Sequence, residues 1–384
     1  PGDRGDAIRE HAHHSMAPVW EANHVWLIFV LTVTWTAYPV YFGSVASTLA
    51  IPFFLAALGI ILRGASYALR SGASGRRELV TIDGAFAIAS LITPFALGTV
   101  VGGIASERVP VGNAAGNLIS SWLNPTSILI GVLAVVSSGY LAAVYLSADA
   151  ARVGDSDIAE AFRIRALGAG LVAGAVALIG LVVLHGDAHS LFEELLHGAA
   201  LVALIASVLA GSVTLGLVWS RRFEASRYTA ALAVATVVAG WAFARYPVLL
   251  PGLDVHQAAA SHDTMVTLIL AVIGGAIILF PSLGLLFSLT LRGRFDPHSA
   301  GGGGGVALDT EPGGGAGSPL RTVVAAAGGP RLGPRVAGAL LVAGFGMLNI
   351  ASAGWAHAIG VVCLFAFMVL SFALIVPRAL AEDA

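Results

Sequence analysis

The chain contains about ten apolar runs, each long enough to cross a lipid bilayer as a helix. About 20 residues of helix span the ~30 Å of hydrocarbon in a bilayer. Only helices suit such runs, because the backbone in lipid must satisfy its own hydrogen bonds. The sequence therefore predicts an all-α, polytopic membrane helical bundle. Its expected spans are residues 25–43, 47–63, 84–104, 125–147, 164–185, 197–219, 228–248, 264–291, 334–352 and 355–376.

Composition supports a membrane protein and excludes several functions. Of the 384 residues, 57% are hydrophobic and 11% are charged, whereas a soluble domain carries about 25% charged residues. The net charge of −2 gives no sign of nucleic-acid binding. The single Cys363 lies in an apolar run, so neither a disulfide framework nor a cysteine metal site is expected. The chain begins at Pro1 rather than Met, and we expect it to lack its true N-terminus.

The arginines predict the orientation of the chain. All 20 basic residues are arginines. When the loops are taken alternately, only Arg108 and Arg245 fall on the side opposite to the others. Cytoplasmic loops of membrane proteins carry an excess of basic residues. We therefore expect a bacterial cytoplasmic (inner) membrane protein with the arginine-rich loops and the C-terminus in the cytoplasm.

A glycine-rich stretch divides the chain. Residues 301–305 are all glycine, and such low-complexity sequence is typical of a flexible linker. We predict a cytoplasmic segment at 1–24, a membrane domain of eight helices at 25–294, a cytoplasmic linker at 295–333 and a terminal helical hairpin at 334–384. Within the membrane domain, Asn124 before Pro125 predicts a capped helix start, and the glycine pairs Gly98/Gly102 and Gly168/Gly170 suit close helix contact.

Polar and aromatic side chains gather at one end of the first two spans. An acid at the edge of a membrane helix is a candidate functional group. We expect Glu21 to start the first helix and Arg63 to end the second after a break near Gly43–Ser47, so that both lie at the cytoplasmic face. The alternatives are that Glu21 only reaches headgroup water and that Arg63 and Arg70 only anchor the chain. The predicted polar cluster comprises Glu21, Asn23, Arg63, Arg70 and Asp83, flanked by Trp20, Trp26 and Tyr67.

The histidines do not predict a metal centre. His185, His189 and His197 are spaced four and eight apart, which resembles metal-ligand spacing on a helix. They fall in a short outer loop, so we favour a solvated polar face over a metal site. No histidine lies in the middle of a predicted span.

Three stretches resemble subunit II of the cytochrome bd-type quinol oxidases. The likeness runs from about residue 7 to about residue 294. Two features depart from the family: its earlier helix with a Gly-Phe-Asp type motif is missing, and Ala68 stands where an acid is usual. The matching stretches are Ser15–Trp26, Leu62–Ala65 with Tyr67 and Arg70, and Trp241–Pro251 followed by Ala258–Ser261.

The resemblance implies an accessory subunit of a terminal oxidase that oxidises quinol and reduces oxygen to water. It places haem b and haem d in the partner, subunit I, and no haem in this chain. It also implies that the chain stabilises the haem-bearing subunit and contributes to proton and oxygen access. The polar cluster around Glu21 is the candidate proton path, and Trp20, Trp26 and Tyr67 belong to the family motif and to packing. The alternative is a stand-alone secondary transporter or permease. That alternative fits less well, because the predicted spans are almost bare of charge at their centres.

Overall fold

The computed structural model describes residues 3–70, 75–291, 329–350, 355–356, 359–360, 362–367 and 370. Apart from one two-stranded hairpin, its regular elements are helices, so the predicted all-α membrane bundle is confirmed. The elements are α1 (Asp3–Ala37), α2 (Pro39–Thr48), α3 (Ala50–Arg70), α4 (Arg76–Ala105), α5 (Pro125–Arg152), α6 (Ser156–Asp187), α7 (His189–Leu195), α8 (Gly198–Trp219), α9 (Phe223–Arg245), β1 (Val248–Leu250), β2 (Leu253–Asp254), α10 (Val255–Ala258), α11 (His262–Leu291) and α13 (Gly329–Ile350).

Seven helices in the described part of the chain are long and apolar enough to span a membrane. They are α3, α4, α5, α6, α8, α9 and α11. The predicted first span is divided instead, because α1 ends at Ala37 and its apolar part is only Val25–Ala37. In α13 the apolar stretch is Arg335–Gly344, and the last predicted span lies largely outside the described residues.

The helix breaks fall at Tyr38 and Leu49, so the predicted break near Gly43–Ser47 is wrong. Tyr38 leaves the helical region with φ −134° and ψ 63°, since a residue before proline is disfavoured in the α conformation. The expectation that Glu21 starts a helix is also wrong, because α1 already begins at Asp3. Alanine, arginine and glutamate in residues 3–10 are good helix formers, which accounts for this earlier start.

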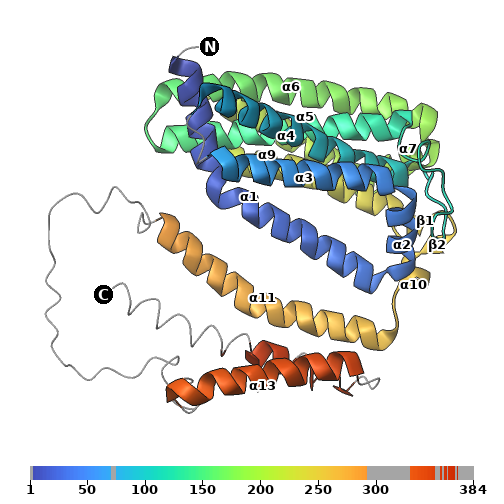
Figure 1. The fold of residues 1–384 in the computed structure, drawn as a ribbon. Helices are drawn as coiled ribbons and strands as arrows, with labels where there is room; N and C mark the ends of the chain where they lie inside the picture. Colours follow the sequence, from blue (N-terminus) through green and yellow to red (C-terminus); the bar gives the residue numbers. More distant parts are fainter. Residues whose placement is uncertain are drawn as a thin grey trace, which may run out of the picture. The chain divides into compact units, whose positions relative to one another are not determined.

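Residues 1–259 form one compact unit, in which consecutive helices pack antiparallel. Helix α4 contacts α3 and α5, α5 also contacts α6 and α9, and α8 packs on α9 (Figure 1). The chain thus returns repeatedly to the same two ends. We call the end that holds Arg70, Arg152 and Arg221 the arginine-rich end, and the end that holds Arg108 and Arg245 the arginine-poor end.

Small residues allow α4 and α5 to cross closely. A Cβ atom on Gly98 would meet the Cα of Gly131, and one on Gly102 would overlap the Cα of Ser127. The predicted close contact of this glycine pair is therefore confirmed. Gly170 lies against Leu215 and Tyr140, whereas Gly168 faces open space and takes no part in such a contact.

The short elements close the arginine-poor end. Helix α2, the β1–β2 hairpin and α10 gather there (Figure 1) around a core that includes the fully buried Leu49, Val109 and Leu250. The hydroxyl groups of Ser44 and Ser47 accept hydrogen bonds from backbone N–H groups of the loop between α4 and α5, at 2.9 and 2.7 Å. This end of the bundle is thus built from tightly connected loops.

Residues 260–384 form the second compact unit. Within it, a Cβ atom on Gly274 of α11 would meet the ring of Phe365, and one on Gly344 of α13 would meet Leu364. Helix α11 therefore packs with the terminal residues, although the sequence assigned it to the domain at 25–294. The predicted linker at 295–333 lies outside the described residues except for the first residues of α13.

Candidate functional site

Arg70 joins three helices at the arginine-rich end. Its guanidinium is in direct contact with the carboxylate of Asp83 on α4, and its Nη2 lies 3.5 Å from Oε2 of Glu10 on α1. The side chains of Arg70, Asp83 and Glu10 are 21, 32 and 57% exposed. Two members of the predicted cluster therefore meet at a partly solvated position. Glu10 was missed, because residues 1–24 were predicted as a polar cytoplasmic segment and the helix was expected to start only at Glu21.

Arg63 lies two helical turns before Arg70, which places both on the same side of α3. Its guanidinium carbon lies 5.3 Å from the centre of the Phe86 ring, a cation–π distance. Phe86 is three residues after Asp83 on α4, so one face of α3 meets one face of α4 through both arginines. Tyr67 lies on the same side of α3, between the two arginines by helical periodicity.

The remaining predicted residues lie on α1. Asn23 is exposed, and Trp26 is 44% exposed with its ring edge against Phe29 at 5.8 Å between centroids. Trp20 and Glu21 also belong to α1, but their side chains are outside those that the structure describes. The expected contact between Glu21 and Arg63 therefore stays a prediction.

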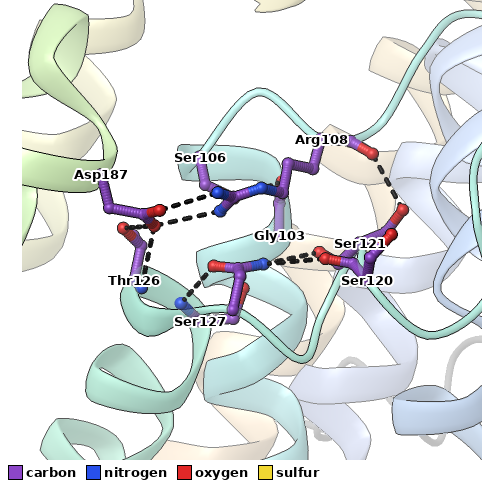
Figure 2. A network of polar contacts seen from close by, with 9 residues as sticks. Gly103, Ser106, Arg108, Ser120, Ser121, Thr126, Ser127 and Asp187 are labelled. Carbon is purple, nitrogen blue, oxygen red and sulfur yellow. Dashed lines mark hydrogen bonds and ion pairs between the residues drawn. The ribbon is translucent and has the colours of Figure 1, made fainter.

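At the arginine-poor end, Arg108 binds Asp187 with two hydrogen bonds. Figure 2 shows the guanidinium and the carboxylate facing each other. The two nitrogen–oxygen distances are 3.0 and 2.7 Å. Asp187 also accepts from the hydroxyl of Thr126 at 2.6 Å and from its backbone N–H at 3.1 Å. The pair ties the loop after α4 to the end of α6 and the start of α5.

The start of α5 carries the predicted cap. The Asn124 side chain accepts a hydrogen bond from the backbone N–H of Ser127 at 2.9 Å, and Pro125 occupies the first turn. The Asn124 amide nitrogen donates back to the carbonyl of Ser121 at 3.2 Å. The hydroxyl of Ser121 in turn donates to the carbonyl of Arg108 (Figure 2). The cap and the ion pair of Arg108 therefore belong to one network.

Arg245 forms the second ion pair of this end. Its Nη1 lies 2.7 Å from Oε1 of Glu107 and 3.8 Å from Oε2 of Glu194. The Arg245 side chain is 8% exposed, and in the described part of the chain it is the only charged side chain that is buried. Ser190 donates a further hydrogen bond to Glu107 at 2.9 Å. A buried charge is stable only when it is paired, and Glu107 and Glu194 provide the opposite charge for Arg245.

The titration of these groups favours a structural role. The hydrogen bond from Arg245 is the main cause that lowers the pKa of Glu107 below its usual value. The hydrogen bonds to Asp187 raise the pKa of Arg108. Both shifts favour the charged forms, so these pairs hold fixed charges at neutral pH. A proton carrier must change its charge easily, and these groups do not.

The arginine-poor end explains the two exceptions in the arginine pattern. Arg108 and Arg245 are the arginines that the sequence placed opposite to the others, and each is neutralised by a carboxylate. The sequence showed both arginines and Asp187, but it offered no pattern that paired residues 79 or 138 positions apart.

Two histidines of the arginine-poor end lie side by side where α6 ends and α7 begins. His185 and His189 are exposed, with ring centres 5.0 Å apart, and Nε2 of His189 lies 3.3 Å from Oε1 of Glu193. Among the residues described, no group of three or more histidine, cysteine or acidic side chains could hold a metal ion.

Comparisons with known proteins match most of the chain. A family model of cytochrome bd terminal oxidase subunit II matches residues 2–290. The cytochrome bd ubiquinol oxidase subunit 2 of Bacillus subtilis (strain 168) is 29% identical over 122 residues, which are 31% of this chain and 36% of that protein. The match thus spans about a third of that relative. A chain of the bd oxidase from Geobacillus thermodenitrificans aligns with TM-score 0.60 and 25% identity, covering 74% of this chain and 87% of that one.

Proposed function

Because the chain belongs to the cytochrome bd terminal oxidase subunit II family, we propose that it is the accessory membrane subunit of a bd-type quinol oxidase. Such a complex oxidises quinol and reduces oxygen to water. The observation that carries the proposal is the family match over residues 2–290, which includes both ends of the bundle. The fold likeness to a bd oxidase chain over 87% of its length supports the same assignment.

We place haem b and haem d in the partner, subunit I. Among the histidines whose side chains the structure describes, His11 lies in the polar N-terminal part of α1. The others lie at helix ends or in connecting segments, including His185 near the end of α6 and His262 at the start of α11. They offer no pair of ligands in the middle of the bundle. The chain would therefore stabilise the haem-bearing subunit, and its own residues would help protons and oxygen to reach that subunit.

We assign the arginine-rich end to the cytoplasm and to proton access. The arginine distribution supports this side, and protons for water formation come from it. Asp83 is 32% exposed and contacts Arg70. Its carboxylate can therefore reach water where α3 and α4 meet at the arginine-rich end. Glu21 lies further along α1 and is the second candidate carrier. The ion pairs at the opposite end would hold the subunit together.

The structure offers little support for a stand-alone transporter. Transporters carry charged or polar groups near the middle of the membrane. Arg245, the buried charge described above, is the last residue of α9 and not a midspan residue. Serine and threonine side chains inside several spans, such as Ser90 and Thr93 of α4, bond to the carbonyls of their own helix.

Complementation tests the proposal. A bacterial strain that lacks this chain, and has no other terminal oxidase, would receive either the full chain or an empty vector. We expect quinol-dependent oxygen uptake by its membranes only when the chain is present together with its haem-bearing partner. Equal uptake without the chain would exclude a role in the oxidase.

A further inference from the structure

The turn between α8 and α9 places an arginine where helices usually end in glycine. The N–H of Arg222 bonds to the carbonyl of Leu217 at 2.8 Å, and the N–H of Arg221 bonds to that of Val218 at 3.2 Å. This is the Schellman arrangement, whose central residue takes a left-handed conformation and is usually glycine. Arg221 occupies that position with φ 58°. The turn between α5 and α6, at the same end, uses Gly154 with φ 82°.

A charged residue in this conformation indicates a role for its side chain, because glycine would fit the backbone better. The only other charged residue with positive φ in the described chain is Glu107, at the end of α4. Glu107 has a clear role for its side chain, since it pairs with the buried Arg245. Arg221 has a weaker partner, because only its Nε lies near Glu160, at 3.3 Å.

The charges around this turn leave a positive surplus. Glu160 is already bound by Arg163, whose Nε lies 2.9 and 3.0 Å from the two carboxylate oxygens. Arg221 is 66% exposed, and Arg222 is exposed with no ion pair to any described residue. The three arginines and Glu160 carry a formal charge of about +2. The nearby acid Glu224 lies 3.7 Å from Arg227 and is engaged there.

The position of Trp219 sets the depth of the cluster. Helix α8 has 22 residues, which is about 33 Å and just spans the hydrocarbon of a bilayer. Trp219 ends this helix and is 72% exposed, as is typical of an aromatic residue at the membrane interface. The guanidinium of Arg163 lies 5.7 Å from its ring centre. With α8 across the bilayer, Arg221 and Arg222, which follow Trp219, would lie at the level of the lipid phosphates.

We propose that Arg221 and Arg222, supported by Arg163 and Trp219, bind the phosphate of an anionic phospholipid headgroup. Guanidinium groups bind phosphate oxygens in pairs, and basic pockets between membrane helices bind anionic headgroups. The ring of Trp219 would lie along the upper part of the acyl chains. This site is separate from the quinol oxidase role, so either proposal can fail without the other.

The test uses the delipidated full chain together with any protein that co-purifies. Phosphatidylglycerol is titrated into this sample. Native mass spectrometry would count the bound lipids. We expect Arg221→Gly to weaken binding roughly fivefold and Arg221→Gly with Arg222→Gln roughly 25-fold, because each basic residue contributes about equally. Arg221→Gly should also keep or raise the unfolding temperature in neutral lipid, because glycine suits the backbone. Arg221→Gln provides the same loss of charge if the glycine variant gives too little protein.

Arg76→Gln with Arg77→Gln is the matched control, because these two exposed arginines lie at the same end. The control should bind phosphatidylglycerol like the unchanged protein. Equal weakening in the control, or no weakening in the Arg221 and Arg222 variants, would overturn the site. A separate arm uses inorganic phosphate in phosphatidylcholine nanodiscs. Saturable stabilisation by phosphate alone, lost in the double variant, would show an ion site and overturn the lipid assignment.

Discussion

The guanidinium of Arg245 at the end of α9 binds the carboxylate of Glu107 just after α4, with 2.7 Å between Nη1 and Oε1. The two residues are 138 positions apart in the sequence. Arg245 is buried, whereas Glu107 is 42% exposed. A partly exposed carboxylate therefore neutralises a guanidinium that is largely removed from water. With Arg108 and Asp187, this pair fixes the loops at one end of the bundle.

Glu107→Gln should destabilise the protein at neutral pH by about 2 kcal/mol, because the buried guanidinium of Arg245 loses its nearer carboxylate and keeps Glu194 at 3.8 Å. Arg245 lowers the pKa of Glu107. The contribution of Glu107 is therefore complete above its usual pKa of 4.5 and is lost as pH falls through the lowered folded value. Thermal unfolding in detergent between pH 7 and pH 3 would measure this. The variant should lose part of the acid dependence of the unchanged protein.

Glu193→Gln is the control for this prediction, because Glu193 is 66% exposed at the same end and pairs only with His189 among the described residues. It should change the unfolding temperature little. An unchanged acid dependence in Glu107→Gln would mean that the pair with Arg245 contributes no stability.

Asp187→Asn should also destabilise the protein, by about 2 kcal/mol, because it removes the negative charge and replaces one of the two oxygens that accept hydrogen bonds from Arg108 by an amide donor. Thr126→Val removes one hydroxyl donor and should cost about 1 kcal/mol. Arg108→Gln combined with Asp187→Asn should cost less than the sum of the single changes, since the residues act as a pair. Denaturant unfolding of the unchanged protein, of Arg108→Gln, of Asp187→Asn and of the double variant completes the cycle, and additive effects would argue against a direct interaction.

Gly102→Ala should separate α4 from α5, because its Cβ would overlap the backbone of Ser127. We expect a loss of about 1–3 kcal/mol, the usual cost of overpacking. Gly168→Ala is the matched control, since Gly168 faces open space on α6, where alanine is the better helix former. Unfolding temperatures of the two variants would be compared. A destabilised control, or a neutral Gly102→Ala, would contradict the close crossing.

Much of the fold could be predicted from the sequence. Apolar runs locate the membrane helices and arginine-rich loops locate their ends, and both features can be recognised from neighbouring residues alone. The cap at Asn124 and the contact of Gly102 also depend on neighbouring residues or on short spacings. The ion pairs could not be predicted, because pairing Arg245 with Glu107 requires the relative positions of α4 and α9. Pro39 is a local signal for the helix break at Tyr38, although the break was predicted near Gly43–Ser47. Glu10 was missed because its partner depends on how far α1 extends.

Glu21→Gln tests the proposed proton path. A neutral isostere keeps the shape of the side chain and removes its titration. We expect slower steady-state oxygen reduction per haem, by about tenfold or more, because a proton-transfer group typically contributes ~10²-fold or more. Glu21→Asp should be milder. A purely structural role for Glu21 predicts less assembled complex with unchanged turnover per haem, and that pattern would end the proton-path proposal for this residue.

The central claim is that this chain acts as the haem-free partner of a haem-bearing oxidase subunit. The most direct measurement is the visible absorption spectrum of the full chain, affinity-purified from membranes with and without its partner, alongside quinol-dependent oxygen uptake. We predict haem b and haem d spectra and oxygen uptake only when the partner co-purifies, and neither from the chain alone. Haem at one or more per chain without the partner, or active oxidase from which this chain is absent, would contradict the account.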